Sequence, residues 1–229
     1  MNIETLDIAT SKGATTAYIA RPTERAAAVI VLIQEYWGVN DHVRDIARRY
    51  AKEGYLCVAP DLYRGKVASS AQEASALMQS LQIDDGLETI RKSIEQTERS
   101  YGAQKIGITG YCMGGTYALR AACEMGQLSA AAPFYGDIPQ ENILKNLRVP
   151  TLFIAAKKDE WINAEKVDTL RQAAQKYKLP VEIVVYDADH AFFNDTRPQV
   201  YEPAAAADAW KRVLAFFGKH LGQAAAKSA

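Results

Sequence analysis

The chain alternates short apolar runs, rich in β-branched residues, with stretches whose apolar residues recur at helical spacing. The run 28–34 (AVIVLIQ) is apolar up to its last residue, which is typical of a strand covered on both faces of a parallel sheet. The same patterns predict further strands at 55–59, 106–109, 129–134, 152–156 and 181–186, and helices over 41–53, 84–99, 113–125, 164–177 and 203–221. Such alternation implies right-handed crossovers, so the expected fold class is α/β with a doubly wound, mostly parallel sheet.

The N-terminal segment differs from the rest because it lacks helical spacing. Two β-prone runs, 5–9 and 16–21, flank Ser11-Lys12-Gly13 and predict an antiparallel hairpin at the edge of the sheet. Asp41 is the expected cap of the first helix, and Gly54 is expected to end it. A length of 229 residues suits a single domain over 1–229, with 63–82 as a candidate lid and 223–229 as a frayed tail.

Charge and cysteine content narrow the class of protein. The 27 basic residues balance the 27 acidic ones, which argues against a nucleic acid or anionic membrane partner. The longest apolar run, 26–33, is too short to span a bilayer, and the first residues do not resemble a secretory signal, so a cytoplasmic location is expected. Three cysteines without Cys-x-x-Cys spacing argue against a disulfide framework or a structural zinc, and no metal is expected. Cys57 and Cys123 are expected to be small buried residues.

The strongest chemical motif is Gly110-Tyr111-Cys112-Met113-Gly114-Gly115, between a predicted strand and a predicted helix. A strand that turns sharply into a helix exposes the middle side chain, and small residues two before and two after it let the backbones pass. The helix N-terminus would then favour negative charge at Cys112. An ordinary buried thiol is the plain alternative, and a dinucleotide-binding turn does not fit the glycine spacing.

Three further polar residues follow predicted strands, where the carboxyl ends of a parallel sheet collect reactive groups. His190 is the expected general base, since His42 and His220 lie at helix ends and are read as structural. Asp159 would orient His190, although Glu160, Asp187, Asp189 and Asp195 are competing acids. The chain order Cys112, Asp159, His190 is that of α/β-hydrolase triads. Glu35 closes the central strand, where burial would favour its neutral form, or is simply a surface acid before a helix.

Together these segments resemble the dienelactone hydrolase (carboxymethylenebutenolidase) family of the α/β-hydrolase superfamily, over nearly the whole chain. The resemblance implies an α/β-hydrolase fold, a Cys112–His190–Asp159 triad, Glu35 as acceptor of the thiol proton, and an oxyanion hole of the Tyr36 and Met113 backbone N–H groups. It implies cysteine-dependent hydrolysis of small esters or lactones through a thioester acyl-enzyme. It implies no metal or organic cofactor, and we expect a monomer or small homo-oligomer.

The sequence departs from the family at the substrate-binding positions. An arginine is expected four residues after the catalytic histidine, where this chain has Asn194, and Arg64, Lys66 or Arg197 are the candidate substitutes. Asp189 replaces a glycine and would raise the pKa of the imidazole. Dienelactone is therefore only one candidate substrate. Aromatic residues that follow strand ends form the expected pocket: Tyr36, Trp37, Phe134, Tyr135, Trp161, Phe192 and Phe193.

Two other functions remain open at this point. A catalytically silent α/β-hydrolase-like protein would use Cys112 as a redox sensor or ligand-binding thiol. A hydrolase of another bond, such as a thioester or peptide, would use the same residues.

Overall fold

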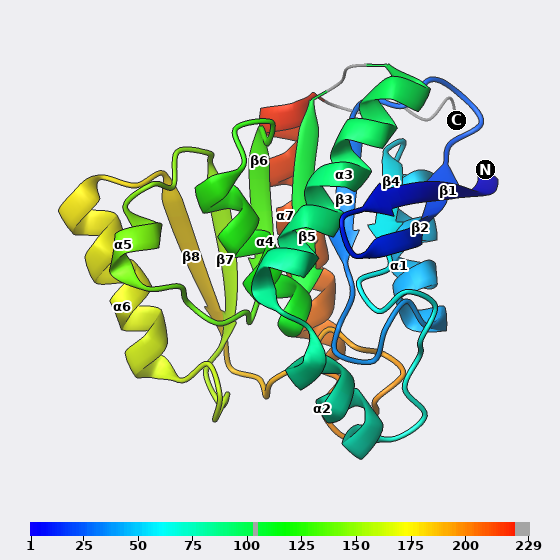
Figure 1. Cartoon of the computed structure of the whole chain (residues 1–229). Helices are drawn as coiled ribbons and strands as arrows, with labels where there is room; N and C mark the ends of the chain where they lie inside the picture. Colours follow the sequence, from blue (N-terminus) through cyan, green and yellow to red (C-terminus); the bar gives the residue numbers. More distant parts are fainter. Residues whose placement is uncertain (103–104, 223–229) are drawn as a thin grey trace.

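The computed structural model describes residues 1–102 and 105–222, and its centre is one eight-stranded sheet (Figure 1). The strands are β1 (Asn2–Thr10), β2 (Gly13–Arg21), β3 (Val29–Ile33), β4 (Leu56–Pro60), β5 (Ile106–Tyr111), β6 (Ala130–Phe134), β7 (Thr151–Ala156) and β8 (Val181–Tyr186). Their order across the sheet is β1-β2-β4-β3-β5-β6-β7-β8. From β4 to β8 all neighbours are parallel, and only β1 and β2 pair antiparallel to their neighbours.

Helices cover both faces of this sheet. They are α1 (Asp41–Lys52), α2 (Ala71–Ser80), α3 (Ile83–Tyr101), α4 (Met113–Glu124), α5 (Glu141–Leu144), α6 (Ala164–Tyr177) and α7 (Pro203–Leu221). The apolar faces of α3, α4 and α6 pack into one core cluster, and those of α1 and α7 pack into a second cluster on the opposite face (Figure 1). The doubly wound arrangement predicted from the sequence is therefore present.

Strand β3, which is formed by most of the apolar run 28–34, is packed against helices on both faces of the sheet. All five residues of β3 are buried. Val29, Val31 and Ile33 pack into the α3–α4 cluster, whereas Ile30 and Leu32 pack against α1 and α7. Because successive side chains of a strand point to opposite faces, this pattern requires helices on both sides.

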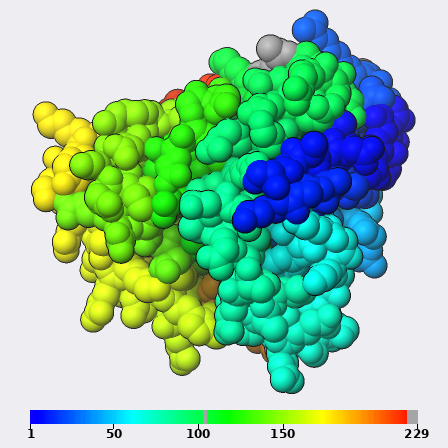
Figure 2. Space-filling view, in the orientation of Figure 1, coloured from blue at the N-terminus to red at the C-terminus, as the bar shows by residue number. Residues whose placement is uncertain are grey.

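The predicted N-terminal hairpin is present and forms the edge of the sheet. Thr10 pairs with Gly13, so the turn is Ser11-Lys12, and both strands are longer than the sequence pattern indicated. Figure 2 shows the hairpin in blue, lying along α3 on the surface of the molecule. The side chain of Ser11 donates to Glu88 of α3 over 2.6 Å, which ties the hairpin tip to that helix.

Two sequence predictions need correction. The cap of α1 is Asn40 and not Asp41, because Asn40 has an extended backbone and its side chain accepts from the Val43 N–H over 3.1 Å. Within the candidate lid 63–82, α2 is a regular helix that the weak apolar pattern did not predict, and Ser70 caps it. Only Ala74 of this helix is buried, which explains the missing signal. The predicted tail 223–229 lies outside the described residues.

Candidate active site

Cys112 occupies a sharp bend between β5 and α4. Its φ of 56° and ψ of −118° lie outside the regions that side-chain-bearing residues favour, a strain of about 1–3 kcal/mol. A Cβ atom added to Gly110 would lie 2.3 Å from the carbonyl oxygen of Gly114, and one added to Gly114 would lie 2.3 Å from that of Ile33. The bend therefore tolerates only hydrogen at these two positions, as the sequence motif predicted.

The first turn of α4 provides one donor to the sulfur of Cys112. The backbone N–H of Met113 hydrogen-bonds the sulfur, and Tyr63 donates its hydroxyl to the Met113 sulfur over 3.2 Å. Tyr36, whose N–H is the second expected oxyanion donor, directly follows Glu35 at the end of β3. In the described part of the chain, neither the Tyr36 nor the Met113 N–H donates to a backbone carbonyl. These two N–H groups therefore have no main-chain partner in the described residues, and the Met113 N–H contacts the Cys112 sulfur.

His190 and Asp159 form a close pair between the ends of β7 and β8. Nδ1 of His190 lies 2.5 Å from Oδ2 of Asp159. The other carboxylate oxygen accepts the N–H groups of Trp161 and Ile162 over 2.9 and 2.8 Å. Burial alone would raise the pKa of Asp159, but the hydrogen bond and charge of His190, together with these N–H groups, lower it. Nε2 of His190 is buried and has no hydrogen-bond partner among the described residues.

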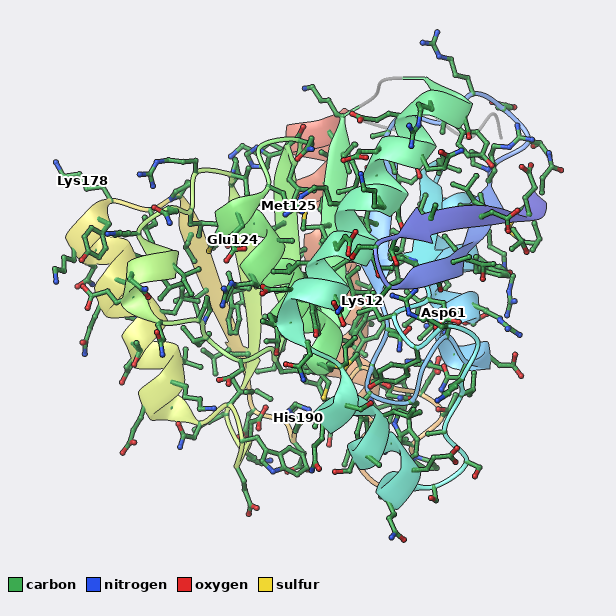
Figure 3. All side chains as sticks on the ribbon, in the orientation of Figure 1. Lys12, Asp61, Glu124, Met125, Lys178 and His190 are labelled. Carbon is green, nitrogen blue, oxygen red and sulfur yellow. The ribbon has the colours of Figure 1, made fainter. Side chains whose placement is uncertain are left out.

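The competing acids lie elsewhere. Asp187 is paired with Lys158 at 3.6 Å, and Asp195 is paired with His42 and Arg49. Glu160 and Asp189 are exposed and make no hydrogen bond or ion pair with His190 in the described structure. Asp159 is therefore the acid in contact with the imidazole. Figure 3 shows His190 near the lower edge of the sheet in that view.

Glu35 follows β3 and is 3% exposed, so it is not a surface acid. Burial raises its pKa, and the charge of His42 and a 2.7 Å hydrogen bond from the side-chain amide of Asn194 act in the opposite direction. Asn194 is itself buried, and its carbonyl oxygen accepts from the hydroxyl of Thr196 over 2.6 Å. The amide orientation of Asn194 is thus fixed with its donor toward Glu35. This neutral contact occupies the position at which the resemblance predicts an arginine.

The thiol of Cys112 is held in its neutral form. Burial raises its pKa to about 12, and the negative charges of Glu35 and Asp159 add to this effect. The Met113 N–H and the charge of Arg197 oppose it. A helix N-terminus alone would have favoured the thiolate, so the buried and acidic surroundings outweigh the helix in the resting protein.

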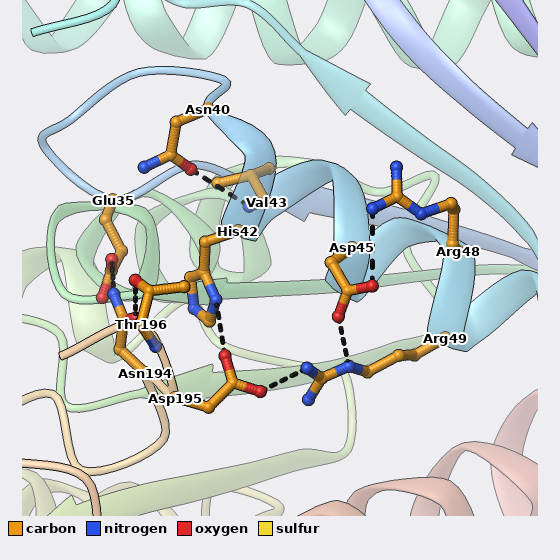
Figure 4. Close-up of polar contacts among 10 residues, drawn as sticks. All are labelled: Glu35, Asn40, His42, Val43, Asp45, Arg48, Arg49, Asn194, Asp195 and Thr196. Carbon is orange, nitrogen blue, oxygen red and sulfur yellow. Dashed lines mark hydrogen bonds and ion pairs between the residues drawn. The ribbon is translucent and has the colours of Figure 1, made fainter. Parts of the chain in front are cut away.

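His42 is buried on α1 and belongs to a network of polar contacts (Figure 4). Its Nδ1 lies 3.3 Å from Oδ1 of Asp195, and the other oxygen of Asp195 accepts from Arg49. Nε of Arg49 also donates to Asp45 over 2.6 Å. The network joins α1 to the segment that contains Asn194. The sequence interpretation of His42 as a helix-end residue missed this environment, because sequence spacing alone does not bring 42 and 195 together.

The predicted aromatic pocket divides into two groups. Phe134, Phe192 and Phe193 are almost fully buried among other rings, so they support the site from the core and offer no surface to a substrate. Trp161 is 68% exposed, and its ring lies 4.9 Å from that of His190. Tyr135 is buried with its ring 5.0 Å from His190.

Tyr36 and Trp37 complete this set. They are partly buried and contact each other with ring centroids 4.7 Å apart. The accessible aromatic surface near the polar residues is therefore provided by Trp161, Tyr36 and Trp37.

The three candidate cations differ in what they contact and in whether their charge acts on the site. Arg64 donates to the carbonyl of Gly13 and the hydroxyl of Thr10 in the N-terminal hairpin, so its guanidinium is committed there. Lys66 is exposed. The charge of Arg197, by contrast, acts on both Glu35 and Cys112. Arg197 is the one of the three with an electrostatic effect on the site.

Among residues 1–102 and 105–222, no group of three or more histidine, cysteine and acidic side chains is placed to hold a metal ion. No helix in the described part of the chain is long and apolar enough to cross a bilayer.

Residues 15–221 match the profile of the Dienelactone hydrolase family. The chain belongs to this family. Protein usf of Aquifex pyrophilus is 36% identical over 216 residues, which cover 89% of this chain and 93% of that protein. A Yersinia pestis protein, provisionally named a carboxymethylenebutenolidase, is 36% identical over 223 residues, covering 89% of this chain and 83% of the other.

A solved structure of the same family shares the fold of this chain. The crystal structure of a provisionally named dienelactone hydrolase from Klebsiella pneumoniae superposes with a TM-score of 0.86 at 32% identity, covering 96% of this chain and all of the other. The predicted α/β-hydrolase fold is confirmed, and the family resemblance seen in the sequence is correct. The chain is a dienelactone hydrolase-like hydrolase, a class whose substrates are small molecules.

Proposed function

We propose that this chain hydrolyses small esters or lactones with Cys112 as nucleophile, through a thioester acyl-enzyme. The observation that carries the proposal is the His190–Asp159 pair, in which the buried Nε2 of His190 has no partner among the described residues. It is supported by the strained, small-residue bend that holds Cys112. An oriented imidazole and a nucleophile on such a bend are the parts that acyl transfer requires.

The proposed acylation begins with transfer of the Cys112 proton to Glu35 when substrate binds. The sulfur retains the electron pair of the S–H bond and attacks the carbonyl carbon, whose π electrons move to oxygen. The Tyr36 and Met113 N–H groups stabilise that oxyanion. Collapse of the intermediate breaks the ester C–O bond, which opens the ring when the substrate is a lactone. The leaving alkoxide takes the proton that Glu35 received from Cys112.

Deacylation uses His190 as a general base. Nε2 takes a proton from water as the water oxygen attacks the thioester carbonyl, and Asp159 stabilises the imidazolium that forms. Collapse then breaks the C–S bond and releases the carboxylic acid. The proton that His190 took from water then passes to sulfur and regenerates the neutral thiol that burial favours.

A silent protein that uses Cys112 as a redox sensor is less well supported. Sensor cysteines are low-pKa, accessible thiolates, whereas burial raises the pKa of Cys112 to about 12. We therefore expect slow alkylation of Cys112 by iodoacetamide at pH 7 without substrate, with a rate that increases about tenfold per pH unit.

The decisive experiment is hydrolysis of p-nitrophenyl acetate by the wild type, Cys112→Ala and Cys123→Ala. Cys123 is a buried thiol on the same helix and is the matched control. We expect Cys112→Ala to be inactive, Cys123→Ala to be active, and mass spectrometry to detect an acyl group on Cys112 after rapid acid quench. Full activity of Cys112→Ala would contradict the proposed nucleophile.

Substrate class is addressed by comparing a neutral aryl ester with one that has a carboxylate in its acyl group. Arg197 is the cation proposed to attract such a group, because its charge reaches Cys112. Arg197→Gln should raise KM for the anionic ester and leave KM for the neutral ester unchanged. Equal effects on both esters would remove Arg197 from substrate selection.

A further inference from the structure

The two expected oxyanion donors lie on separate segments of the chain, and both must face the same point for one oxygen to accept from them. The Tyr36 N–H lies in the turn 35–38, which the Gly38 N–H closes by donating to the Glu35 carbonyl over 3.2 Å. The Met113 N–H belongs to the first residue of α4, where an N–H group has no acceptor within the helix. Regular secondary structure therefore fixes neither donor.

Part of the connection between β4 and α2, residues 61–68, is folded against this region (Figure 1). Asp61 at its start is 8% exposed, and its side chain accepts the N–H of Tyr63 over 2.8 Å. The Leu62 N–H donates to the side chain of Gln34, which directly follows β3, over 3.1 Å. These contacts fix the start of the 61–68 segment to the end of β3.

Tyr63 connects this segment to the first donor. Its hydroxyl donates to the sulfur of Met113 over 3.2 Å, and both side chains are 6% exposed. A methionine side chain has three rotatable bonds and a sulfur that accepts weakly, so a buried donor at this distance selects one of its conformations. Because the same residue carries the N–H that contacts the Cys112 sulfur, the Tyr63 hydroxyl restrains the side of the site formed by α4.

The far end of the segment contacts the turn that contains the second donor. The Ala68 N–H donates to the carbonyl of Trp37 over 2.9 Å. Gly38 has a φ of 96°, and a Cβ atom there would lie 2.6 Å from the carbonyl oxygen of Lys66. The turn therefore has no room to move toward the 61–68 segment, and the hydrogen bond opposes movement away from it.

We propose that the 61–68 segment positions the oxyanion hole, with Tyr63 holding the Met113 side and Ala68 holding the Tyr36 side. Both are positioning residues, because neither contacts the substrate or the reacting atoms in this scheme. The inference rests on the proposed function, since an oxyanion forms only when a nucleophile adds to a carbonyl. Removal of a whole oxyanion donor lowers the rate by about 10²–10³-fold, so loss of its support is expected to cost less, about tenfold.

The first test is a double-mutant cycle on the hydrolysis of p-nitrophenyl acetate. Tyr63→Phe removes only the hydroxyl, and Met113→Leu removes the sulfur at nearly constant volume. We expect Tyr63→Phe to lower kcat/KM about tenfold in the wild type and less than about twofold in Met113→Leu. Tyr55→Phe is the control, because Tyr55 is 3% exposed but lies just before β4, at the opposite end of that strand. The same loss in both backgrounds would overturn the proposal.

A second pair of measurements separates the oxyanion hole from the nucleophile. Trifluoroacetophenone inhibits when the sulfur adds to its carbonyl carbon, the π electrons move to oxygen and the thiol proton passes to Glu35, so its Ki reports oxyanion binding. Iodomethane methylates sulfur with loss of iodide and has no carbonyl oxygen. In Tyr63→Phe we expect Ki to rise about tenfold, and methylation of Cys112, followed by mass spectrometry, to change less than about twofold. Equal losses in both would mean that Tyr63 supports the thiol and would overturn the proposal.

Gly38→Ala tests the contact with the other donor. Its Cβ would meet the Lys66 carbonyl, whereas Gly102 has a similar φ of 87° and nothing within 4 Å of an added Cβ. The two substitutions share the strain of a positive φ, and only Gly38→Ala pushes on the 61–68 segment. We expect Gly38→Ala to lower ester hydrolysis about tenfold with methylation retained, and Gly102→Ala to keep wild-type rates. If Gly38→Ala does not fold, Tyr63→Phe, which keeps the ring, still decides the proposal.

Failure of the inference and failure of the proposed function give different results. If the wild type hydrolyses no ester, the proposed function fails and the oxyanion inference fails with it. If the wild type is active and Cys112→Ala is inactive, but Tyr63→Phe and Gly38→Ala keep wild-type rates, the inference alone is overturned.

Discussion

The side-chain amide of Asn194 donates a 2.7 Å hydrogen bond to Oε2 of Glu35, across 159 residues of sequence. This contact joins the segment after β8 to the end of β3, so the loop that begins with His190 and the strand that ends at Glu35 are fixed relative to each other. Asn194 supplies a hydrogen bond to Glu35 at this position but no positive charge.

Asp159→Asn should lower kcat for ester hydrolysis by about 10⁴-fold, in analogy with serine-protease triads, because an amide would favour the wrong tautomer of His190. Steady-state kinetics on an aryl ester measure the effect. Glu160→Gln, an exposed neighbour, is the control and should retain wild-type rates. Near-normal turnover in Asp159→Asn would show that His190 does not need this acid.

Glu35→Gln should make the folded protein less sensitive to pH between acid and neutral conditions. Burial raises the pKa of Glu35 in the folded state, so the unfolded chain ionises first as pH rises. The stability that this group contributes is full below the ordinary pKa of glutamate and is lost as pH rises through the folded-state value. Glutamine does not ionise and should not show this loss.

Denaturant midpoints at pH 4 and pH 8 measure this difference. We expect the stability of Glu35→Gln minus that of the wild type to be larger at pH 8 than at pH 4. Ester hydrolysis by the variant should be slower than by the wild type. Identical pH dependence of stability in both proteins would mean that Glu35 is not strongly desolvated.

Gly114→Ala should destabilise the fold by about 3 kcal/mol, since its Cβ would lie 2.3 Å from the carbonyl oxygen of Ile33. Gly126→Ala, where a Cβ meets nothing within 4 Å, should change stability by no more than about 0.5 kcal/mol. Urea unfolding of the pair compares the two sites with the same substitution. Equal stabilities would show that the bend can widen.

Trp161→Ala should raise KM for aryl esters by about 2- to 10-fold through loss of ring contacts, with little change in stability. The ring is 68% exposed and lies beside His190, so few packing contacts are lost. Steady-state kinetics on aryl and short alkyl esters measure the change in KM. Urea unfolding measures the change in stability. A similar KM change for the alkyl esters would point to a general disturbance of His190.

Sequence reasoning predicted the sheet because its strands combine hydrophobicity with β-branching. The run 28–34 predicted a strand covered on two faces, and the glycines around Cys112 predicted the bend. Helix α2 was missed because a helix that buries only Ala74 has almost no apolar face to detect. Asn40 was passed over as a cap because Asp41 beside it is an equally suitable residue type.

The environment of each site residue was harder to predict. Nothing local distinguishes Asp159 from the exposed Glu160, because the choice between them depends on how β7 and β8 bring the two loops together. The burial of His42 against Asp195 likewise depends on a contact across 153 positions of sequence, between a helix and a distant loop. Phe134 and Phe192 follow strands as pocket residues would, yet they point into the core.

The tight bend at Cys112 restricts the backbone but not the reactive side-chain atom. A Cβ atom at Gly110 or Gly114 would lie 2.3 Å from a backbone carbonyl oxygen, so the main chain cannot change there, whereas the Cys112 side chain is partly exposed. An exchange of sulfur for the oxygen of serine would change one atom and leave the scaffold as it is. The reactive atom at this bend can therefore be exchanged without rebuilding the fold.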